Sequence, residues 1–423
     1  MEQMRVSQPR RPYSLALWID RWIGTAICAL LALAKKGLNS RKPLASQDVE
    51  KVLLLKMWGM GSIVLASPLF EQIRAKYPGA RIDFVTLSEN AAILELYPAI
   101  GKTFTIDLGR GIPYFLLATV RTIRAIRRER YDLILDLEFF TRFSAIFSLF
   151  ARPRRSHGFS AKGKWRGRLH DVEVPFNAYN HVSLNFLDLL QGDPMAPVDS
   201  ALVGRASALP AIAASEECWE SCQRILREDA AFRPDEPIVV VNPNAGDMAL
   251  ERRWPPEQVA ELLEHLCAQR AANVVVTGSK SEREYVESVV NASGTAQRVV
   301  NLAGRISIAE LVALFEHAAV CVTNDSGPLH IASASGTSTV ALFGPETPTL
   351  YGPLRSREEQ RHAVHYLKLA CSPCMFVHDN KVLSCWFAQA KCMTGITPSA
   401  VLASIDELLA PASTGALRVV DTP

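Results

Sequence analysis

Short apolar segments alternate with longer amphipathic segments through most of this 423-residue chain. The alternation begins at Lys51, is interrupted by a segment rich in Pro, Ala, Ser and Gly at residues 192–209, and restarts at Ile238. Strands that alternate with helices predict parallel sheets covered by helices. A chain of this length has room for two domains of about 200 residues each. We therefore expect two similar α/β domains around a linker, with a ligand cleft between them.

The apolar pattern also predicts the individual elements. Strands are predicted at residues 51–56, 81–86, 104–107 and 133–137, and then at 238–241, 273–276, 319–322 and 339–343. Helices are predicted at residues 63–76, 89–97, 114–130 and 181–190, and then at 257–268, 281–290, 307–317 and 397–409. The last helix is expected to start with Thr397 as its cap and Pro398 at its first position. No regular structure is predicted in the linker.

The composition is that of an ordinary globular protein, with 48% apolar and 21% charged residues, which excludes a wholly disordered chain. The net charge of +3 is unevenly distributed, because residues 1–42 contain eight Lys and Arg against two acids. The rest of the chain is therefore slightly acidic. A nucleic-acid-binding protein usually has a basic patch on its folded domain. We therefore expect no nucleic-acid partner.

The amino-terminal arm contains an uncharged, mostly apolar run at residues 22–34, with Trp18 and Trp22 near its start and basic residues on both sides. The run is shorter than the roughly 20 residues that a membrane-spanning helix needs. One interpretation is an in-plane helix on an anionic membrane surface, involving residues 10–42. A signal peptide whose apolar run ends at Ala34 and a helix packed on the folded body are the other two. All three remain open.

The nine cysteines fall into two groups. Five lie in apolar or helical contexts and are expected to be core thiols: Cys28, Cys218, Cys222, Cys267 and Cys321. The other four begin with a C-x2-C pair in a segment punctuated by Pro and Gly: Cys371, Cys374, Cys385 and Cys392. Four clustered cysteines can hold one tetrahedral Zn or Fe ion. Reduced structural thiols explain the segment equally well.

One strand end has the composition of an anion site. The predicted strand at 319–322 is followed by T-N-D-S-G-P-L-H at 323–330, with Pro328 at a plausible first helical position. A polar Gly turn between a strand and a helix presents free N–H groups and a positive dipole end to a phosphate. Asp325 and His330 at the mouth of such a site suggest recognition of more than phosphate. Simple capping of the helix is the alternative explanation.

Three other strand ends carry candidate binding residues. The first is the Gly-x-Gly turn of Gly59 and Gly61, with Ser62 available to cap the next helix. The second contains Asn244, Gly246 and Asp247 and is followed by Arg252 and Arg253, whose guanidinium groups suit a diphosphate. The third, Thr277 and Gly278, is a candidate to contact a base or a ribose, with an ordinary loop between strand and helix as the alternative. Loops after parallel strands emerge at one edge of a sheet, so we expect the loops of the second half to converge on a nucleotide diphosphate.

The segments 51–76, 242–255, 301–304, 323–344 and 371–393 resemble, in this order, glycosyltransferase family 9, the lipopolysaccharide heptosyltransferases. The most specific pieces are N-D-S-G-P-L-H-I-A at 324–332 and R-R-W-P at 252–255, and the resemblance extends from about Lys51 to Leu409. It implies a GT-B fold, in which two Rossmann-like domains face a cleft and the carboxyl-terminal one holds the nucleotide sugar. It also implies transfer from ADP-heptose to an inner-core sugar, with inversion at the anomeric carbon.

The resemblance implies roles for individual residues. Asp325 matches the family's sugar-contacting Asp, and Arg252 stands where the family usually has a Lys near the diphosphate. The phosphate-binding turn of the family matches Ser326, Gly327, Pro328 and His330. The remaining residues expected at the donor site are Asn244, Gly246, Asp247, Arg253, Thr277, Gly278 and Asn324.

One departure concerns the catalytic base. The family usually has Gly-Asp in its first loop, and that Asp is taken to deprotonate the acceptor hydroxyl. This chain has Gly61-Ser62 instead, and an unassisted Ser hydroxyl is a poor base. Asp83, Glu89 and Glu138 are the other carboxylates considered for the role. A different acceptor, or weak activity, would also account for the change.

These arguments together predict a basic amphipathic arm (1–48), an acceptor-side domain (49–195), a linker (196–212), a nucleotide-sugar domain that includes the Cys-rich segment 371–393 (213–412), and a tail (413–423). The expected function is transfer of a heptose or related sugar to a lipopolysaccharide-core or other surface-glycan acceptor, with no obligatory cofactor. We expect the protein to be cytoplasmic and peripheral on the inner face of the cytoplasmic membrane. A nucleotide-sugar-binding protein with little or no turnover and a nucleotide-sugar epimerase are the alternatives.

Overall fold

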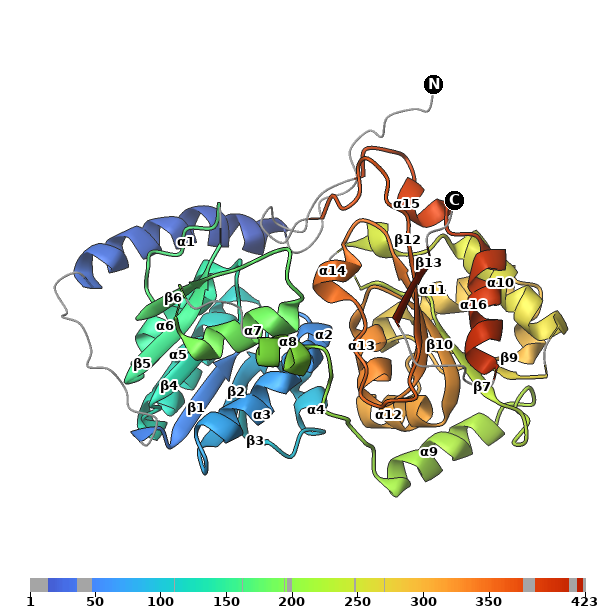
Figure 1. Ribbon diagram of the computed structural model, residues 1–423, viewed down its shortest axis with the longest axis horizontal. Coiled ribbons are helices and arrows are strands. Elements are labelled where there is room, and N and C mark those ends of the chain that lie inside the picture. The colour runs from blue at the N-terminus through green and yellow to red at the C-terminus, as the bar shows by residue number, and fades with distance from the viewer. Residues whose placement is uncertain are drawn as a thin grey trace. The chain divides into compact units, whose positions relative to one another are not determined.

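The computed structural model describes residues 14–35, 48–109, 111–161, 163–193, 195, 200–246, 249–269, 271–375, 385–410 and 417–420. The chain divides into an amino-terminal unit that ends at Ser207 and a carboxyl-terminal unit that begins at Ala208 (Figure 1). Each unit contains one parallel sheet flanked by helices (Figure 1).

The sheet of the amino-terminal unit has six parallel strands in the order β3-β2-β1-β4-β5-β6. They are β1 (Lys51–Leu55), β2 (Arg81–Leu87), β3 (Ile100–Ile106), β4 (Leu133–Asp136), β5 (Arg155–Ser160) and β6 (Val172–Pro175). The strand order reverses at β1, which pairs with β2 on one side and with β4 on the other. The loops after β1 and β4 therefore lie at a topological switch point, where α/β sheets usually bind ligands.

The helices of this unit are α1 (Ser14–Lys35), α2 (Met60–Leu65), α3 (Ser67–Lys76), α4 (Ala91–Leu94), α5 (Ile112–Glu129), α6 (Arg142–Ala151), α7 (Val182–Gln191) and α8 (Ser200–Ala206). The single helix predicted at 63–76 is wrong: it is two helices, because Pro68 lacks an N–H and cannot continue α2. The prediction of no regular structure at 192–209 is also wrong. Leu202 and Ala206, four residues apart, bury one side of α8.

The sheet of the carboxyl-terminal unit has seven parallel strands in the order β13-β12-β11-β10-β7-β8-β9. They are β7 (Ile238–Asn242), β8 (Asn273–Val276), β9 (Val299–Asn301), β10 (Ala318–Asn324), β11 (Ser338–Phe343), β12 (His362–Tyr366) and β13 (Leu417–Val420). Its helices are α9 (Glu216–Arg227), α10 (Pro256–Gln269), α11 (Arg283–Ala292), α12 (Ile308–Glu316), α13 (Gly327–Ala334), α14 (Pro348–Tyr351), α15 (Lys391–Thr394) and α16 (Pro398–Leu409). The cap predicted for α16 is confirmed, because Thr397 Oγ1 accepts a hydrogen bond from the N–H of Ala400 at 3.3 Å.

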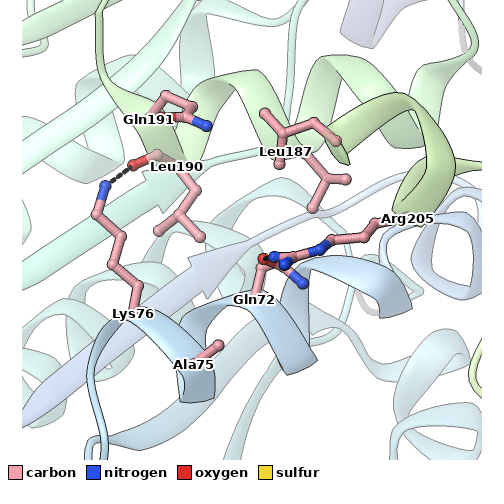
Figure 2. Close-up of a pocket in the computed structure, with 8 residues that line it drawn as sticks. Gln72, Ala75, Lys76, Leu187, Leu190, Gln191 and Arg205 are labelled. Carbon is pink, nitrogen blue, oxygen red and sulfur yellow. Dashed lines mark hydrogen bonds between the residues drawn. The ribbon is translucent and has the colours of Figure 1, made fainter. Parts of the chain in front are cut away.

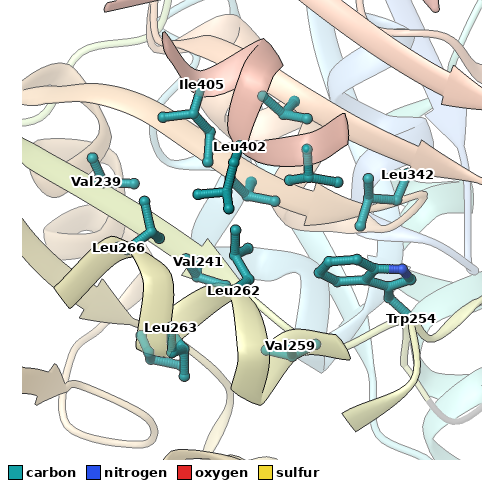
Figure 3. Close-up of a cluster of buried hydrophobic side chains, with 14 of the residues drawn as sticks. Val239, Val241, Trp254, Val259, Leu262, Leu263, Leu266, Leu342, Leu402 and Ile405 are labelled. Atoms are coloured by element: carbon teal, nitrogen blue, oxygen red, sulfur yellow. The ribbon is translucent and has the colours of Figure 1, made fainter. Parts of the chain in front are cut away.

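An apolar core packs α10 and α16 against one face of this second sheet (Figure 3). Val239 and Val241 point to the same face of β7 because side chains alternate along a strand. Trp254 closes one end of this core: its side chain is 1% exposed, and its Nε1–H donates to the carbonyl of Ile396 at 2.9 Å. The core therefore fixes the backbone directly after Arg252 and Arg253.

Buried histidines make the free energy of unfolding depend on pH. Burial lowers the pKa of His365 to about 4, and its Nε2 lies 2.9 Å from Ser404 Oγ. The folded state holds this ring neutral, whereas the unfolded chain takes up a proton below about pH 6.5. The stabilisation is therefore complete above pH 6.5 and is lost as the pH falls toward 4, at a cost of about 3 kcal/mol.

Lowering the pH from 7 to 4.5 should reduce the free energy of unfolding in both proteins. We expect this reduction to be about 2 kcal/mol smaller in His365→Leu than in the wild type. Urea unfolding at the two pH values measures this difference. His265→Leu, at a partly exposed position of α10, is the control and should behave as the wild type does. Equal acid sensitivity of the wild type and His365→Leu would contradict the prediction.

A cavity of about 250 Å³ lies in the amino-terminal unit beside α3, α7 and α8 (Figure 2). Its lining includes Leu187, Leu190 and Arg205, and Lys76, whose Nζ donates to the carbonyl of Leu190 at 2.9 Å. It contains none of the residues that the sequence suggests for binding or catalysis. We therefore treat it as separate from the candidate site.

Candidate functional site

The predicted binding loops of the carboxyl-terminal unit start from neighbouring strands. The sheet places β10 beside β7 and β7 beside β8, with Thr323 paired to Asn242 and Val241 paired to Val276. Since the three strands are parallel and in register near their carboxyl ends, their loops emerge at the same edge. The segments that follow β7, β8 and β10 are thus brought together within this unit.

Asn324 holds two of these segments in place. Its side chain is 1% exposed, and its Oδ1 accepts a hydrogen bond from the N–H of Trp254 at 3.0 Å. Its Nδ2 donates to the carbonyls of Pro243 at 3.0 Å and Asn244 at 3.1 Å. One buried amide therefore fixes both the loop after β7 and the segment that carries the two arginines.

Arg252 and Asp325 form an ion pair at this edge. Arg252 Nη1 lies 3.3 Å from Asp325 Oδ2, and their side chains are 15% and 5% exposed. The second guanidinium nitrogen, Nη2, donates to the carbonyl of Ala245 at 2.9 Å. The backbone N–H of Asp325 donates to Leu342 at 3.0 Å, which fixes the carboxylate at the end of β10. A cation and an anion are thus held side by side, close to solvent.

Thr277, Gly278 and Asn244 meet on the other side of β7. The Nδ2 of Asn242 donates to Thr277 Oγ1 at 3.1 Å, and Asn242 Oδ1 accepts from the N–H of Asn244 at 3.3 Å. A Cβ atom on Gly278 would lie 2.9 Å from Asn244 Nδ2 and 3.0 Å from Val286 Cγ2. A larger residue there would press on the side chains of Asn244 and of Val286 in α11, so the small size of glycine suits this position.

The helix that follows Asp325 begins one residue earlier than the sequence suggests. α13 starts at Gly327, so Pro328 occupies its second position, and Ser326 is the cap residue but makes no capping hydrogen bond with its side chain. Ser326 Oγ instead donates to the carbonyl of Asn324 at 3.2 Å. The amides of a first helical turn have no partner within the helix and favour an anion. His330, 3% exposed, lies in the body of α13.

The two arginines of the R-R-W-P element point to different partners. The guanidinium of Arg253 lies 4.0 Å from the ring centroid of Tyr285, in cation–π geometry. Only Arg252 is paired with Asp325 by an ion pair. Gly246 is exposed at the end of the loop after β7. Asp247, also predicted to bind the nucleotide, lies outside the described residues.

In the amino-terminal unit, the Gly-x-Gly turn follows β1. Gly59 has φ of +85° and precedes α2, which begins at Met60. Gly61 and Ser62 consequently lie inside the first helical turn, and the N–H of Ser62 donates to the carbonyl of Gly59 at 2.9 Å. The expectation that the Ser62 side chain caps this helix is wrong, because no side chain makes a capping hydrogen bond there.

The buried carboxylate of Glu138 fixes the start of the same turn. Its Oε1 accepts hydrogen bonds from Lys56 Nζ at 3.0 Å and from the backbone N–H groups of Met57 and Trp58 at 2.9 Å each. Glu138 is fully buried, and so is Lys56 to within 1%. Oε1 thus holds the turn in place and the whole carboxylate is buried, so Glu138 does not suit deprotonation of a hydroxyl that arrives from solvent.

The two remaining candidates for the base differ in their surroundings. Asp83 is fully buried, accepts from Arg81 Nη2 at 2.7 Å and from the N–H of Lys102 at 2.8 Å, and also bonds the Tyr131 hydroxyl. Glu89 lies directly after β2, at the same edge as the turn after β1, and is exposed. Neighbouring atoms partly desolvate its carboxyl, which raises its pKa. Of the three, only Glu89 is accessible.

We expect Gly59→Ala to lower activity at least tenfold, because a side chain at this φ strains the turn and moves the loop. Its Cβ would also approach Ser62 Oγ to 3.3 Å. Gly79→Ala is the matched control, since Gly79 has the same φ of +85° and nothing within 4 Å of its Cβ position. Both variants should lose about 1 to 2 kcal/mol of stability. Steady-state rates that fall equally in the two variants would contradict a role for the loop.

The four cysteines of the carboxyl-terminal segment line one cavity of about 20 Å³, together with Trp386 and Phe387. All nine cysteines of the chain are free thiols. Burial raises the pKa of Cys392 to about 12 and also raises that of Cys374, and the proximity of the other cysteines of the group adds to both shifts. Among the residues that the structure describes, no three His, Cys, Asp or Glu side chains are placed to hold one metal ion. The Zn or Fe ion suggested by the sequence stays a prediction.

Comparison with known proteins places the chain in a family. Residues 119–380 match the protein family described as "Glycosyltransferase family 9 (heptosyltransferase)". The chain belongs to glycosyltransferase family 9. It is 26% identical over 312 residues to lipooligosaccharide heptosyltransferase 2 of Haemophilus influenzae, covering 72% of this chain and 86% of that protein. It is also 26% identical to lipopolysaccharide heptosyltransferase 3 of Escherichia coli K12, over 73% of this chain and 87% of that protein.

Solved structures agree on the fold of this family 9 glycosyltransferase. It is similar to the E. coli ADP-heptose lipopolysaccharide heptosyltransferase II with a TM-score of 0.65 and 22% identity, over 85% of this chain and 98% of that chain. It is similar to a family 9 glycosyl transferase of Veillonella parvula with a TM-score of 0.67 and 20% identity, over 86% and 98% of the two chains. The GT-B fold predicted from the resemblance is confirmed, and the chain is a glycosyltransferase.

Several residues that organise the site of this glycosyltransferase were not singled out from the sequence. They are Lys56, Asn242, Trp254 and Tyr285. Lys56 and Asn242 each stand at or directly after the carboxyl end of a strand, inside the segments 51–76 and 242–255 that carry the family resemblance. Trp254 belongs to the R-R-W-P element, and its part in the core depends on Ile396, 142 residues away.

Proposed function

We propose that this family 9 member transfers a heptose from ADP-heptose to an inner-core sugar of lipopolysaccharide or a related surface glycan. The names of its relatives support this reaction, since they are lipooligosaccharide and lipopolysaccharide heptosyltransferases. The observation that carries the proposal is the Arg252–Asp325 pair at the start of α13. In a nucleotide sugar the sugar is bonded to a phosphate, so a site must hold a cation and a sugar-binding carboxylate close together.

In this proposal the carboxyl-terminal unit holds the donor. The Asp325 carboxylate accepts hydrogen bonds from sugar hydroxyls, and Arg252 and the first amides of α13, near Ser326 and Gly327, face the diphosphate. The loop of Asn244, Gly246 and Asp247 and the turn of Thr277 and Gly278 contact the nucleoside. Asn324 acts as a positioning residue beneath them, and Pro328 and His330 keep α13 in place.

The reaction is a displacement with inversion at the anomeric carbon. A base removes the proton of the acceptor hydroxyl, its oxygen forms a bond to the anomeric carbon, and ADP leaves with the electrons of the broken bond. The negative charge that develops on the departing diphosphate is stabilised by Arg252, with the helix dipole of α13 adding to the effect. The proton ends on the base and passes to solvent.

We infer that Glu89 is the base that replaces the missing Asp, with Ser62 and the Gly59 turn shaping the acceptor side. Glu89→Gln should lower kcat about 100-fold or more and leave ADP binding unchanged. Because the base works deprotonated and its pKa is raised, the wild-type rate should fall on the acid side, and the variant should lose this limb of the pH profile. Glu95→Gln, also exposed and six residues along the chain, is the matched control. A Glu89→Gln rate near that of the control would assign the base elsewhere.

The acceptor also bears on where the enzyme works. A lipid-linked core sugar is held at a membrane, so we propose that the protein is cytoplasmic and peripheral on the inner face of the cytoplasmic membrane. Among the described residues, no helix is long and apolar enough to cross a bilayer.

Calorimetric titration with ADP, UDP and GDP tests the donor site directly. We expect selective binding of ADP, weakened about tenfold or more in Arg252→Ala because a charge-assisted contact to phosphate is lost. Transfer is then measured with ADP-heptose and a heptose-bearing core acceptor. Binding of UDP or GDP in place of ADP would move the donor away from ADP-heptose. Sugar exchange without any acceptor would indicate an epimerase instead.

A further inference from the structure

Helix α1 is attached to the amino-terminal unit along one side only. Near its start, Asp20 Oδ1 accepts hydrogen bonds from the N–H groups of Arg142 and Phe143, each at 2.9 Å. At its end, Lys35 Nζ donates to the carbonyls of Leu169 at 2.8 Å and His170 at 2.7 Å. These contacts are about 22 Å apart along the helix axis, so α1 is held at both ends.

Polar contacts and packing act together on this inner side. Asp20 occupies the position of a capping group for α6, whose own cap residue Thr141 makes no side-chain capping bond. Midway along the helix, Cys28 is fully buried and packs with Ala145 and Leu169. Of the charged residues in Ser14–Lys35, Asp20 and Lys35 are used by these contacts, and only Arg21 remains.

The outer side of α1 is apolar, and none of the residues that the structure describes covers it. Trp18, Trp22, Leu30 and Leu33 are 54%, 59%, 69% and 68% exposed, and their spacing places them on one stripe of a helix. The Arg21 guanidinium lies 5.6 Å from the centroid of the Trp22 ring. A helix held to the body by one side and apolar on the other needs a partner for the outer side.

A second helix of the same unit, α5, also exposes apolar side chains. α6 packs against both α1 and α5, as Figure 1 shows. The first turns of α5 expose Ile112, Leu116 and Val120, and its last turns carry Arg121, Arg124, Arg127 and Arg128. We call Trp18, Trp22, Leu30 and Leu33 of α1 together with Ile112, Leu116 and Val120 of α5 the docking face.

We propose that the docking face binds the surface of an anionic lipid bilayer, with α1 lying in the plane of the membrane. Apolar side chains enter the acyl boundary, Trp rings occupy the headgroup level, and Arg side chains meet anionic headgroups. The sequence on either side of α1 adds Arg10, Arg11, Lys36, Arg41 and Lys42. The inference deepens the proposed function, since it fixes the acceptor-side unit where a lipid-linked acceptor is found.

Charge favours a membrane over a second copy of the chain. Residues 1–42 carry eight Lys and Arg against two acids, and the last turns of α5 are also basic. Two copies that met through this face would bring like charges together, whereas an anionic bilayer is complementary to them. The short apolar stripe also matches an interfacial helix rather than a spanning one, in agreement with the lack of a spanning helix among the described residues.

Vesicle flotation of the full-length protein, without donor or acceptor, tests the inference. We expect binding to vesicles that contain phosphatidylglycerol at least tenfold stronger than to vesicles of phosphatidylcholine alone, and weaker in high salt. The double variant Trp22→Ser, Leu30→Ser should lose at least tenfold in binding with an unchanged melting temperature. Met195→Ser, Val203→Ser, at positions 87% and 46% exposed elsewhere in the unit, is the matched control and should bind normally.

Each contrary result has a definite meaning. Absence of wild-type binding, or equal binding by Trp22→Ser, Leu30→Ser, would overturn the proposal. A wild-type dimer in light scattering that this variant dissociates would assign the face to a second copy. Unchanged binding of Ile112→Ser, Leu116→Ser would remove α5 from the face. ADP titration of the same samples keeps the two proposals separate, because a failure of the donor site leaves vesicle binding intact.

Discussion

Asp325→Asn should lower the rate of sugar transfer by about 100-fold or more, while ADP binds at least as tightly as it does to the wild type. The carboxylate lies 3.3 Å from Arg252 and is 5% exposed, so its contacts with a sugar hydroxyl would be made in a site with little water. Loss of a charged hydrogen-bonding group at a reacting centre typically costs about 3 to 4 kcal/mol of transition-state stabilisation. Removal of a negative charge beside the guanidinium should strengthen its attraction for a diphosphate.

The paired variant makes the prediction specific. Arg252→Ala should weaken ADP binding, whereas Asp325→Asn should not, although both break the same ion pair. Calorimetry with ADP and single-turnover transfer from ADP-heptose separate the two effects. If both variants lost ADP affinity to the same extent, the pair would be a structural unit of the loop, and Asp325 would not be assigned to the sugar.

Asn324→Ala should destabilise the carboxyl-terminal unit by about 3 to 5 kcal/mol and also reduce ADP binding. The change leaves three buried backbone groups without partners, namely the N–H of Trp254 and the carbonyls of Pro243 and Asn244. Each unsatisfied group costs about 1 to 3 kcal/mol, less where water can reach it. The loop after β7 and the arginine segment would both be released from β10.

Asn273→Ala is a matched control in the same sheet. Asn273 lies at the amino end of β8, away from the binding loops at the carboxyl ends of the strands. Asn273 is 3% exposed, accepts from the N–H of Arg233 at 2.7 Å, and donates to the carbonyls of Arg233 at 2.7 Å and Glu236 at 2.8 Å. It therefore makes the same kinds of hydrogen bond as Asn324. Urea unfolding should show similar losses for both variants, with ADP affinity reduced only in Asn324→Ala. Equal ADP affinities in the folded variants would exclude the positioning role of Asn324.

Local sequence patterns predicted much of the two parallel sheets. The strand at Asn273–Val276 and the cap of α16 at Thr397 were predicted from four or five consecutive residues. The sequence missed α6, α9, β5, β6, β12 and β13 as well as two elements with weak local signals. β9 has three residues, and α8 is a short Ala-rich helix that depends on packing against α7. Marginal segments of this kind become ordered through tertiary contacts rather than propensity.

At the site, too, short motifs predicted individual residues but not the contacts between residues far apart in the chain. The turn at Asn324 to Gly327 and the arginines at 252 and 253 were recognisable because Gly, Pro and Arg have distinctive roles at strand ends. Their mutual arrangement was not, because Asn324 and Trp254 are 70 residues apart and meet through one buried amide. Likewise Glu138, considered from the sequence as a base, is buried and bonded to Lys56, a pairing across 82 residues.

The amino-acid sequence by itself determined the α/β class, the family motifs and the positions of the candidate binding loops, because these depend on periodicity and on residue types within a few positions. Only the tertiary structure decided which carboxylates are occupied, which arginine pairs with Asp325, and which side of α1 is left uncovered. Burial and pairing depend on segments far apart in the chain. Those properties set the charge state, accessibility and orientation of a side chain, and no local pattern encodes them.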